Sequence, residues 1–290
     1  MDDDTLTVFP DEQAIRYRIA QISDLPPLTG AMQRLLEIIY NEVVSLAELE
    51  KVILYDQFLS VRILRLANSS FYGCRGQVNT IAEAIMLLGF DQVKSICLST
   101  LLMQLCSDGA SIDPQQKEKL WKHAFAVARI AGQIAQIKPW ISKDLAYVLG
   151  LFHDVGRLAM AVHFFEYFAA VSDLTETRKC PQWVVESQCG ITHTEIGRWM
   201  CVKWALPEVF QRVTEFHHQP YRSPSHRSEV ILVSLADVLA NSGEFPEYVN
   251  DQLTLSFVRQ LCLTEEDWEN CIDRSRDVWP QVAAFWALLK

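Results

Sequence analysis

A histidine and an aspartate stand side by side in an otherwise apolar stretch of this chain. His153 and Asp154 lie in the middle of the sequence GLFHDVGRL, which covers residues 150–158. Burying an imidazole and a carboxylate without partners would cost several kcal/mol, so the fold must compensate both groups. A mutual hydrogen bond in the core is the simpler compensation. A divalent cation is the more specific one, because histidine and aspartate are common ligands of borderline and hard metal ions.

Further histidines and one aspartate occur on successive predicted helices, mostly on their inward faces. They are His123, His193, His217, His218 and Asp237. Each of them, taken singly, has an ordinary interpretation as a satisfied core residue, and a lone inward histidine such as His123 is more often that than a ligand. Together with His153 and Asp154 they include five of the seven histidines of the chain.

The elements that must position these residues are predicted to be helices. Helical periodicity runs through most of the chain and strand-like alternation is scarce, so the predicted fold class is all-α. Asp113 and Pro114 are a strong helix start, and this helix should carry His123 and end near residue 137. Further helices are expected at about residues 11–22, 30–41, 45–55, 60–69, 80–90, 91–106, 166–191 (interrupted near 177–181), 192–200, 207–217, 227–241, 264–272 and 280–289.

The helix that begins after Ser142 leads directly into His153. Neighbouring residues on a helix diverge by about 100°, so His153 and Asp154 can reach one ion only at the edge of the buried face or where the helix distorts. Gly150 and Gly156 leave room for close approach of another helix or of a ligand.

Composition excludes several classes of protein. The 290 residues carry a net charge of −10, and no window concentrates lysine and arginine, which argues against nucleic-acid binding. The eight cysteines are scattered without a CxxC pair, as expected of reduced thiols rather than disulfides or a zinc ribbon. We see no apolar run of the 18 to 20 residues that a membrane span needs and no signal peptide in MDDDTL, so we expect a cytoplasmic protein without membrane contact.

The first part of the chain is similar to a known family. The runs LPPLTGAMQRLLEII, YDQFLSVRILRLANSSFYG and TIAEAIMLLGFDQVKSI resemble the HDOD domain of bacterial signalling proteins, which is related to the metal-dependent HD phosphohydrolases. The resemblance extends over about residues 22–240. It implies an HD-like helical domain at 109–242, preceded by an N-terminal helical subdomain at 1–108, and we expect residues 243–290 to form a C-terminal helical extension.

The resemblance also implies a ligand set. In the HD relatives the order is a histidine, an adjacent His-Asp pair and a distant aspartate, which correspond here to His123, His153, Asp154 and Asp237. Members that hold two metals have additional histidines between these positions, and His193, His217 and His218 would then serve a second ion, with Asp154 as the bridge. The mixed imidazole and carboxylate set suits iron, manganese or zinc better than calcium.

Three departures from the relatives are visible in the sequence. Arg157 stands where many relatives have the lysine of HDxGK, and Lys119 stands where some multinuclear relatives have an acid. The Gly-Tyr-Pro continuation of cyclic dinucleotide phosphodiesterases is absent after His218, so that activity is not expected.

Two functions follow from the resemblance. The first is a signal-transduction module that acts through signalling proteins as partners and holds a divalent metal for structure or sensing. The alternative is a metal-dependent phosphohydrolase for a nucleotide or other phosphoester, with Asp154 and Arg157 as the catalytic residues. An enzyme requires an open coordination position and a pocket lined by cations, whereas a pure binding module requires neither. A homo-oligomer is a further expectation that the sequence does not test.

Overall fold

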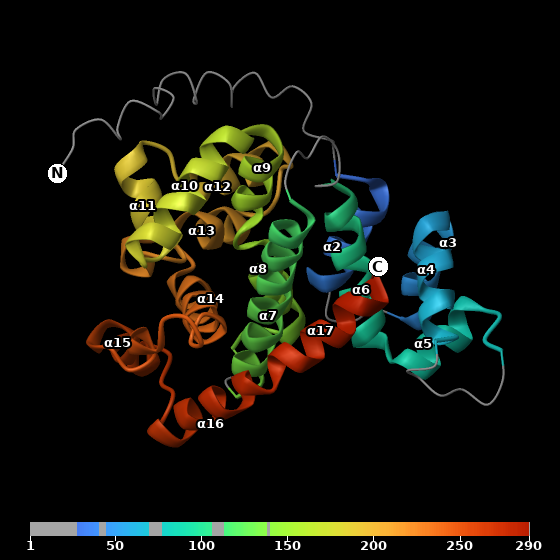
Figure 1. Ribbon diagram of the computed structural model, residues 1–290. Helices are drawn as coiled ribbons and strands as arrows, with labels where there is room; N and C mark the ends of the chain where they lie inside the picture. Colours follow the sequence, from blue (N-terminus) through green and yellow to red (C-terminus); the bar gives the residue numbers. More distant parts are fainter. Residues whose placement is uncertain (1–27, 41–44, 70–76, 106–112, 138–139, 290) are drawn as a thin grey trace. The chain divides into compact units, whose positions relative to one another are not determined.

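The structure is a computed structural model that describes residues 28–40, 45–69, 77–105, 113–137 and 140–289 (Figure 1). These ranges are helical and contain no strand, which confirms the all-α prediction. The helix expected at residues 11–22 and the domain boundary expected at 108/109 lie outside the described residues.

By their internal contacts the described residues divide into two compact units. The smaller unit comprises residues from Leu28 to Leu105 together with those from Ala283 onward, and the larger unit runs from Asp113 to Val282. The helices of the smaller unit are α2 (Gly30–Tyr40), α3 (Leu46–Tyr55), α4 (Gln57–Ala67), α5 (Ile81–Leu88) and α6 (Phe90–Leu105).

Polar side chains set the helix ends of the smaller unit. The Asp56 carboxylate accepts hydrogen bonds from the backbone N–H groups of Phe58 and Leu59, so α4 begins three residues before the predicted start at Ser60. Asn68, within the segment RLANSSFYG, both donates to and accepts from the backbone of Val78 at 2.8 Å. This pair of hydrogen bonds anchors the segment that leads into α5.

The larger unit contains every predicted site residue. Its helices are α7 (Pro114–Ile137), α8 (Lys143–Phe152), α9 (Val155–His163), α10 (Phe165–Arg178), α11 (Gln182–Cys189), α12 (His193–Lys203), α13 (Glu208–Phe216), α14 (Arg227–Ala240), α15 (Gln252–Gln260) and α16 (Glu265–Arg276), with short 3-10 turns η2 (Pro220–Arg222) and η3 (Pro246–Tyr248), and α17 (Val278–Leu289) follows. The sequence predicted a loop between residues 242 and 263. The structure corrects this prediction, because Asp251 caps α15 by accepting from Thr254 N–H.

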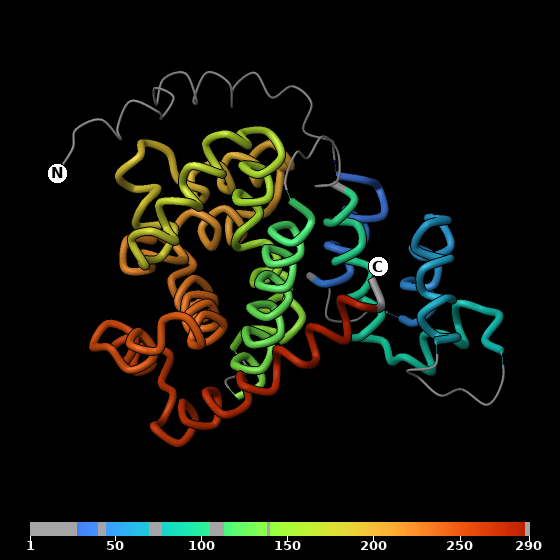
Figure 2. Tube along the Cα trace, in the orientation of Figure 1, coloured from blue at the N-terminus to red at the C-terminus, as the bar shows by residue number. Residues whose placement is uncertain are grey.

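Helices α7, α8 and α14 pack side by side at the centre of the larger unit (Figure 2). A Cβ atom added to Gly150 of α8 would lie only 2.8 Å from the Cα of Ala128 in α7. Only glycine permits this approach, so the prediction that Gly150 makes room for another helix is confirmed. Trp121 and Phe125 of α7 and Phe152 of α8 are fully buried, so the core of these helices is closely packed.

Of the two ways in which His153 and Asp154 could reach one space, the structure has a distortion of the helix. Helix α8 ends at Phe152 and α9 begins at Val155, which leaves His153 and Asp154 at the break between them. Asp154 has φ −104° and ψ 19°, outside the helical range. The break turns both side chains toward the same interior space, so the 100° divergence of a regular helix does not apply.

One helical stretch has the length and composition of a membrane span, which the sequence analysis did not foresee. It is Lys143–His163, the combined length of α8 and α9, and 78% of its most apolar window is buried inside the protein. Helices α5 and α6 pass the same test only as a pair, and they are bent by 110° at Gly89. A mostly buried apolar helix is typical of a protein core, so this is weak evidence for a membrane span.

Candidate metal centre

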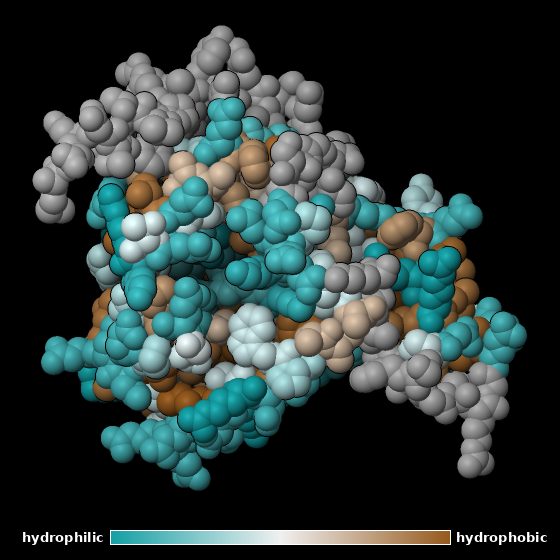
Figure 3. Space-filling view, in the orientation of Figure 1, coloured by the Kyte–Doolittle hydropathy of each residue, from teal (hydrophilic) through white to brown (hydrophobic). Residues whose placement is uncertain are grey.

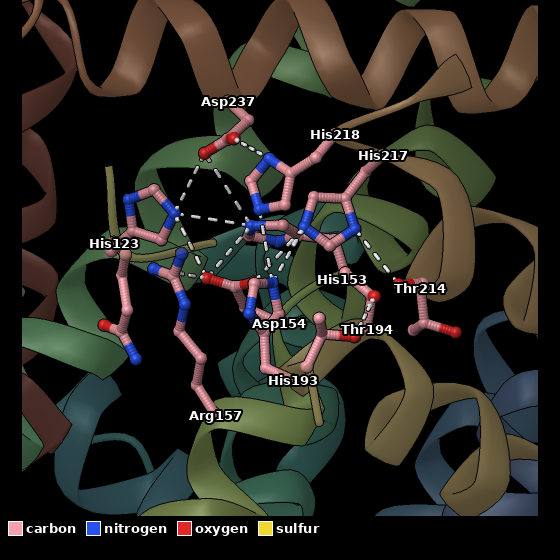
Figure 4. A network of polar contacts seen from close by, with 12 residues as sticks. His123, His153, Asp154, Arg157, His193, Thr194, Thr214, His217, His218 and Asp237 are labelled. Carbon is pink, nitrogen blue, oxygen red and sulfur yellow. Dashed lines mark hydrogen bonds and ion pairs between the residues drawn. The ribbon is translucent and has the colours of Figure 1, made fainter. Parts of the chain in front are cut away.

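The seven side chains that the sequence identified as ligands lie together in the larger unit (Figure 4). They come from five different places: α7 carries His123, the α8–α9 break carries His153 and Asp154, and α12 begins with His193. The remaining three are His217 and His218 directly after α13 and Asp237 in α14. The structure thus brings all of them together, and their binding of a metal stays a prediction.

The cluster consists of two groups of ligand atoms. In the first, one atom each from His123, His153 and Asp154 lie within 4.8 Å of one another. Asp237 adjoins this group, because its Oδ1 is 3.1 Å from His123 Nε2. In the second group, atoms of Asp154, His193, His217 and His218 meet the same limit. Each group offers enough nitrogen and oxygen atoms for one divalent ion.

Asp154 belongs to both groups, and each of its oxygens faces one of them. Oδ2 lies 3.6 Å from His123 Nε2 and 3.5 Å from His153 Nε2, on the side of the first group. Oδ1 lies 3.2 Å from His193 Nε2 and 3.4 Å from His217 Nε2, on the side of the second. This is the arrangement of a carboxylate that bridges two ions, as the resemblance implied.

Backbone carbonyl oxygens that accept a hydrogen bond from Nδ1 determine the tautomer of two of the imidazoles, so that the unprotonated Nε2 faces the cluster. His153 Nδ1 donates to the carbonyl oxygen of Gly150 at 2.7 Å, and His217 Nδ1 donates to that of Val213 at 3.1 Å. Because a carbonyl only accepts, Nδ1 carries the proton in both rings, and in the neutral ring Nε2 is then unprotonated. Such a hydrogen bond behind a ligating histidine is the usual support of a metal site.

The inward nitrogens face one another at short range. The Nε2 atoms of His123 and His153 are 3.3 Å apart, those of His193 and His217 are 3.4 Å apart, and those of His218 and His193 are 3.2 Å apart. Asp154 Oδ1 is buried and accepts no hydrogen bond of good geometry. Two nitrogens bound to one ion at about 2.1 Å are separated by roughly 3.0 to 3.4 Å in octahedral or tetrahedral geometry. The residues present therefore fit divalent metal ions.

Burial and charge together set the protonation of the metal-free cluster. Burial lowers the pKa of His153 to about 3 and that of His218 well below its usual value, so both rings are neutral and competent to bind. Burial opposes protonation of His193 as well, but the Glu186 and Asp154 carboxylates outweigh it and raise its pKa to about 9. A bound cation would take the place of this proton.

Arg157 lies one turn into α9, beside the bridging carboxylate. Its guanidinium is 3.0 Å from Asp154 Oδ2, and the Asp154 carboxylate in turn raises the pKa of Arg157 against the effect of burial. Burial would raise the pKa of Asp154, but Arg157 and then the neighbouring imidazoles hold it well below its usual value. Asp154 is consequently an anion throughout the physiological range of pH.

Two residues that support the cluster were missed by the sequence analysis, and both lie in α11. Glu186 is fully buried and accepts hydrogen bonds from the backbone N–H and the Nδ1–H of His193, at 2.8 and 2.5 Å. Trp183 stacks on His218, with ring centroids 5.3 Å apart and planes inclined by 18°. A signal for Glu186 was present, since it follows the buried Val185 in an apolar run, and an acid in that setting needs a partner.

A pocket of about 620 Å³ lies against the cluster. His123, His217, His218, Asp237 and Arg157 form part of its wall. Lys119 and Lys122 contribute two more cations from α7, and six aromatic side chains also line the pocket: Phe168, Trp183, Phe245, Tyr248, Phe257 and Trp279. Figure 3 shows a hydrophilic recess on the face between α10, α14 and α7. The edge of the cluster is therefore reachable by a ligand larger than water.

The chain belongs to the HDOD domain family. The family model matches residues 25–220, which is more than half of the chain. A curated relative from Treponema pallidum, itself uncharacterized, is 24% identical over 250 residues. That match covers 82% of this chain and 47% of the relative, so the chain spans about half the length of the relative.

Solved structures share the fold. An HDOD domain protein of unknown function from Geobacter sulfurreducens superposes with a TM-score of 0.78 at 22% identity, over 96% of this chain and 98% of the other. A protein from Marinobacter aquaeolei, named provisionally as a signal transduction protein, superposes with a TM-score of 0.79 at 22% identity, over 100% of this chain and 69% of the other. A protein from Shewanella amazonensis, named provisionally as a phosphohydrolase, superposes with a TM-score of 0.71 at 19% identity, over 96% of this chain and 98% of the other. These similarities confirm the predicted HD-like helical architecture.

Proposed function

We propose that this protein is a metal-dependent phosphohydrolase that acts on a phosphoester. The observation that carries the proposal is the adjacency of two features: a buried cluster able to hold two divalent ions, and a pocket whose wall is partly made by that cluster and by Arg157. A module that used the histidines only as core would need no cavity at their edge and no cations around it.

The ligand chemistry supports this class of reaction. Divalent iron, manganese or zinc, when bound, would lower the pKa of a bound water and neutralise charge on the phosphoryl oxygens. Asp154 would hold both ions through its two oxygens, and His123, His153 and Asp237 would complete the first site. His193, His217 and His218 would complete the second.

The chain's own residues would orient the substrate. Arg157 is held in place by Asp154 and presents a permanent cation to the pocket. Lys119 is exposed on the pocket wall and is available to attract a second anionic group. The aromatic side chains of the pocket lining would give an apolar surface for the remainder of the ester.

The test is elemental analysis of protein purified without added metal or chelator, followed by hydrolysis of p-nitrophenyl phosphate and bis(p-nitrophenyl) phosphate. We expect up to two equivalents of metal and a metal-dependent release of nitrophenol. Asp154→Asn should abolish both, while Asp273→Asn, which removes an exposed carboxylate paired with Arg276, should preserve both. Absence of metal from the wild-type protein, even after reconstitution, would refute the proposal.

A second candidate function, regulation through protein partners, is favoured by a separate observation on the smaller unit. Helices α3, α4 and α5 expose large apolar side chains, among them Tyr55, Phe58 and Met86, of which Tyr55 is 86% exposed. Exposed apolar groups of this size often mark protein–protein contacts. The two functions are compatible, because the metal cluster and these side chains belong to different units.

One genetic experiment separates the two functions. A strain lacking the gene is complemented with either the Asp154→Asn variant or the Tyr55→Ser/Phe58→Ser variant. Rescue by the first variant alone would indicate that partner binding carries the biological role. Rescue by the second alone would indicate that the metal site does.

A further inference from the structure

Helix α11 contains none of the predicted ligands, yet two of its side chains contact ligands of the second group. Glu186 binds His193 and Trp183 stacks on His218. Neither residue touches His123 or His153 in any contact that the structure records among the described residues. The support from α11 is therefore directed to one half of the cluster.

Glu186 differs from the acceptors behind the other imidazoles in carrying a charge. His153 and His217 donate to neutral backbone carbonyls, whereas His193 Nδ1 donates to a carboxylate that is fully buried. Gln182 donates to the second oxygen of that carboxylate at 2.9 Å, which holds it in one orientation. A charge-assisted hydrogen bond is stronger than a neutral one, and it increases the electron density that His193 Nε2 can offer to a metal.

His218 depends on Trp183 for a different reason. Its Nδ1 is 3.7 Å from Asp237 Oδ2, which is too long for a hydrogen bond, and it has no carbonyl acceptor among its recorded contacts. The Trp183 ring covers one face of the imidazole and limits its rotation. Trp183 and His218 both form part of the pocket wall.

We propose that α11 is the positioning element of the second metal site, with Glu186 orienting and strengthening His193 and Trp183 restraining His218. This inference rests on the proposed metal binding and not on hydrolysis. It makes the affinity of the second site dependent on α11, while that of the first site, built from His123, His153, Asp154 and Asp237, is independent of it. Glu186 and Trp183 act through ligands and are themselves positioning residues.

The test is a titration of metal-free protein with Zn²⁺ against a chromophoric chelator, which yields the two dissociation constants separately. Glu186→Gln keeps an acceptor for the imidazole but removes the charge, and Glu186→Ala removes both. We expect the dissociation constant of one binding step, that of the second site, to rise about 10-fold in Glu186→Gln and about 100-fold in Glu186→Ala, with the constant of the other step unchanged. Trp183→Ala should weaken the same step and Trp183→Phe, which retains a stacking ring, should restore it.

Glu195→Gln is the matched control. Glu195 lies in the first turn of the same helix as His193 and forms the capping box with Thr192, so its loss perturbs α12 without touching the imidazole. We expect both dissociation constants to remain at the wild-type values in this variant. Circular dichroism of each metal-free variant verifies that the helices are retained, and the Trp183 pair provides the same test if the Glu186 variants fail to fold.

The outcomes are distinct. The assignment of α11 to the second site would be overturned if both dissociation constants of Glu186→Ala equalled those of wild type. It would also be overturned if both binding steps were weakened equally. Weakening by Glu195→Gln as large as by Glu186→Gln would also overturn it, because a general effect on α12 would then suffice. Failure of the wild-type protein to bind Zn²⁺ would instead refute the proposed metal centre itself.

Discussion

Replacement of Gly156 by alanine is the most direct test of how the fold holds the cluster together. A Cβ atom at this position would lie 1.9 Å from the carbonyl oxygen of His193 and 2.7 Å from the backbone nitrogen of Gly197. Both obstacles are backbone atoms of α12, so no side-chain rotation relieves the clash. Helices α9 and α12 must move apart.

The size of the movement follows from contact distances. A carbon and a carbonyl oxygen approach to about 3.3 Å, so the clash with His193 requires a displacement of roughly 1.4 Å. Overpacking of this kind costs about 1 to 3 kcal/mol, and the backbone obstacle puts Gly156→Ala at the upper end. The same movement separates Asp154, at the start of α9, from His193, at the start of α12, whose facing atoms are now 3.2 Å apart. A shared ion cannot bridge the widened gap.

Two measurements check this expectation. Denaturant unfolding of the metal-free variant should show a loss of about 3 kcal/mol, and a Zn²⁺ titration should show loss of the second site. Gly132→Ala is the matched control, because an added Cβ in α7 would meet nothing closer than Lys143 O at 3.5 Å. That variant should be as stable as wild type or up to about 1 kcal/mol more stable. A Gly156→Ala protein with unchanged stability and two bound ions would refute the reasoning.

Three further predictions concern charge and metal. Metal-free protein should be most stable near pH 6.5, as thermal unfolding between pH 3 and 9 will show. The stabilisation from protonated His193, whose folded pKa is about 9, is lost as the pH rises from 6.5 to 9. The stabilisation from neutral His153, whose folded pKa is about 3, is lost as the pH falls from 6.5 to 3. Zn²⁺ at a thousandfold excess over its dissociation constant should raise the free energy of unfolding by about 4 kcal/mol per site. Calorimetric unfolding curves that are the same with Zn²⁺ and with a chelator would contradict the metal centre. Lys119→Ala should raise KM for an anionic phosphoester about two- to fivefold with kcat unchanged, since an exposed cation contributes at most about 1 kcal/mol, and an unchanged KM would remove Lys119 from the binding surface.

The sequence by itself determined the class of fold and identified the candidate ligand residues that the structure brings together. Helical periodicity and capping residues such as Thr192 and Ser142 are local signals, and the structure has helices that begin at both. For His153 and Asp154 the sequence left two alternatives, the edge of a buried face or a distorted helix, and the structure has the distortion. Helix α15 was missed although its local signals are present in the sequence: Asp251 caps it, and Phe257, Val258 and Leu261 recur at helical spacing on its buried face.

Tertiary structure alone decided what stands behind the ligands and beside them. Glu186 reaches His193 from another helix, and Trp183 reaches His218 across more than thirty residues of sequence, so no local pattern pairs them. The division of Asp154 between two groups depends on the approach of α9 to α12, which the absence of a side chain at Gly156 permits. The pocket likewise arises between α7, α10, α14 and the segment before α15. Residue types set which chemistry is available, but only packing over long sequence separations sets the distances at which it operates.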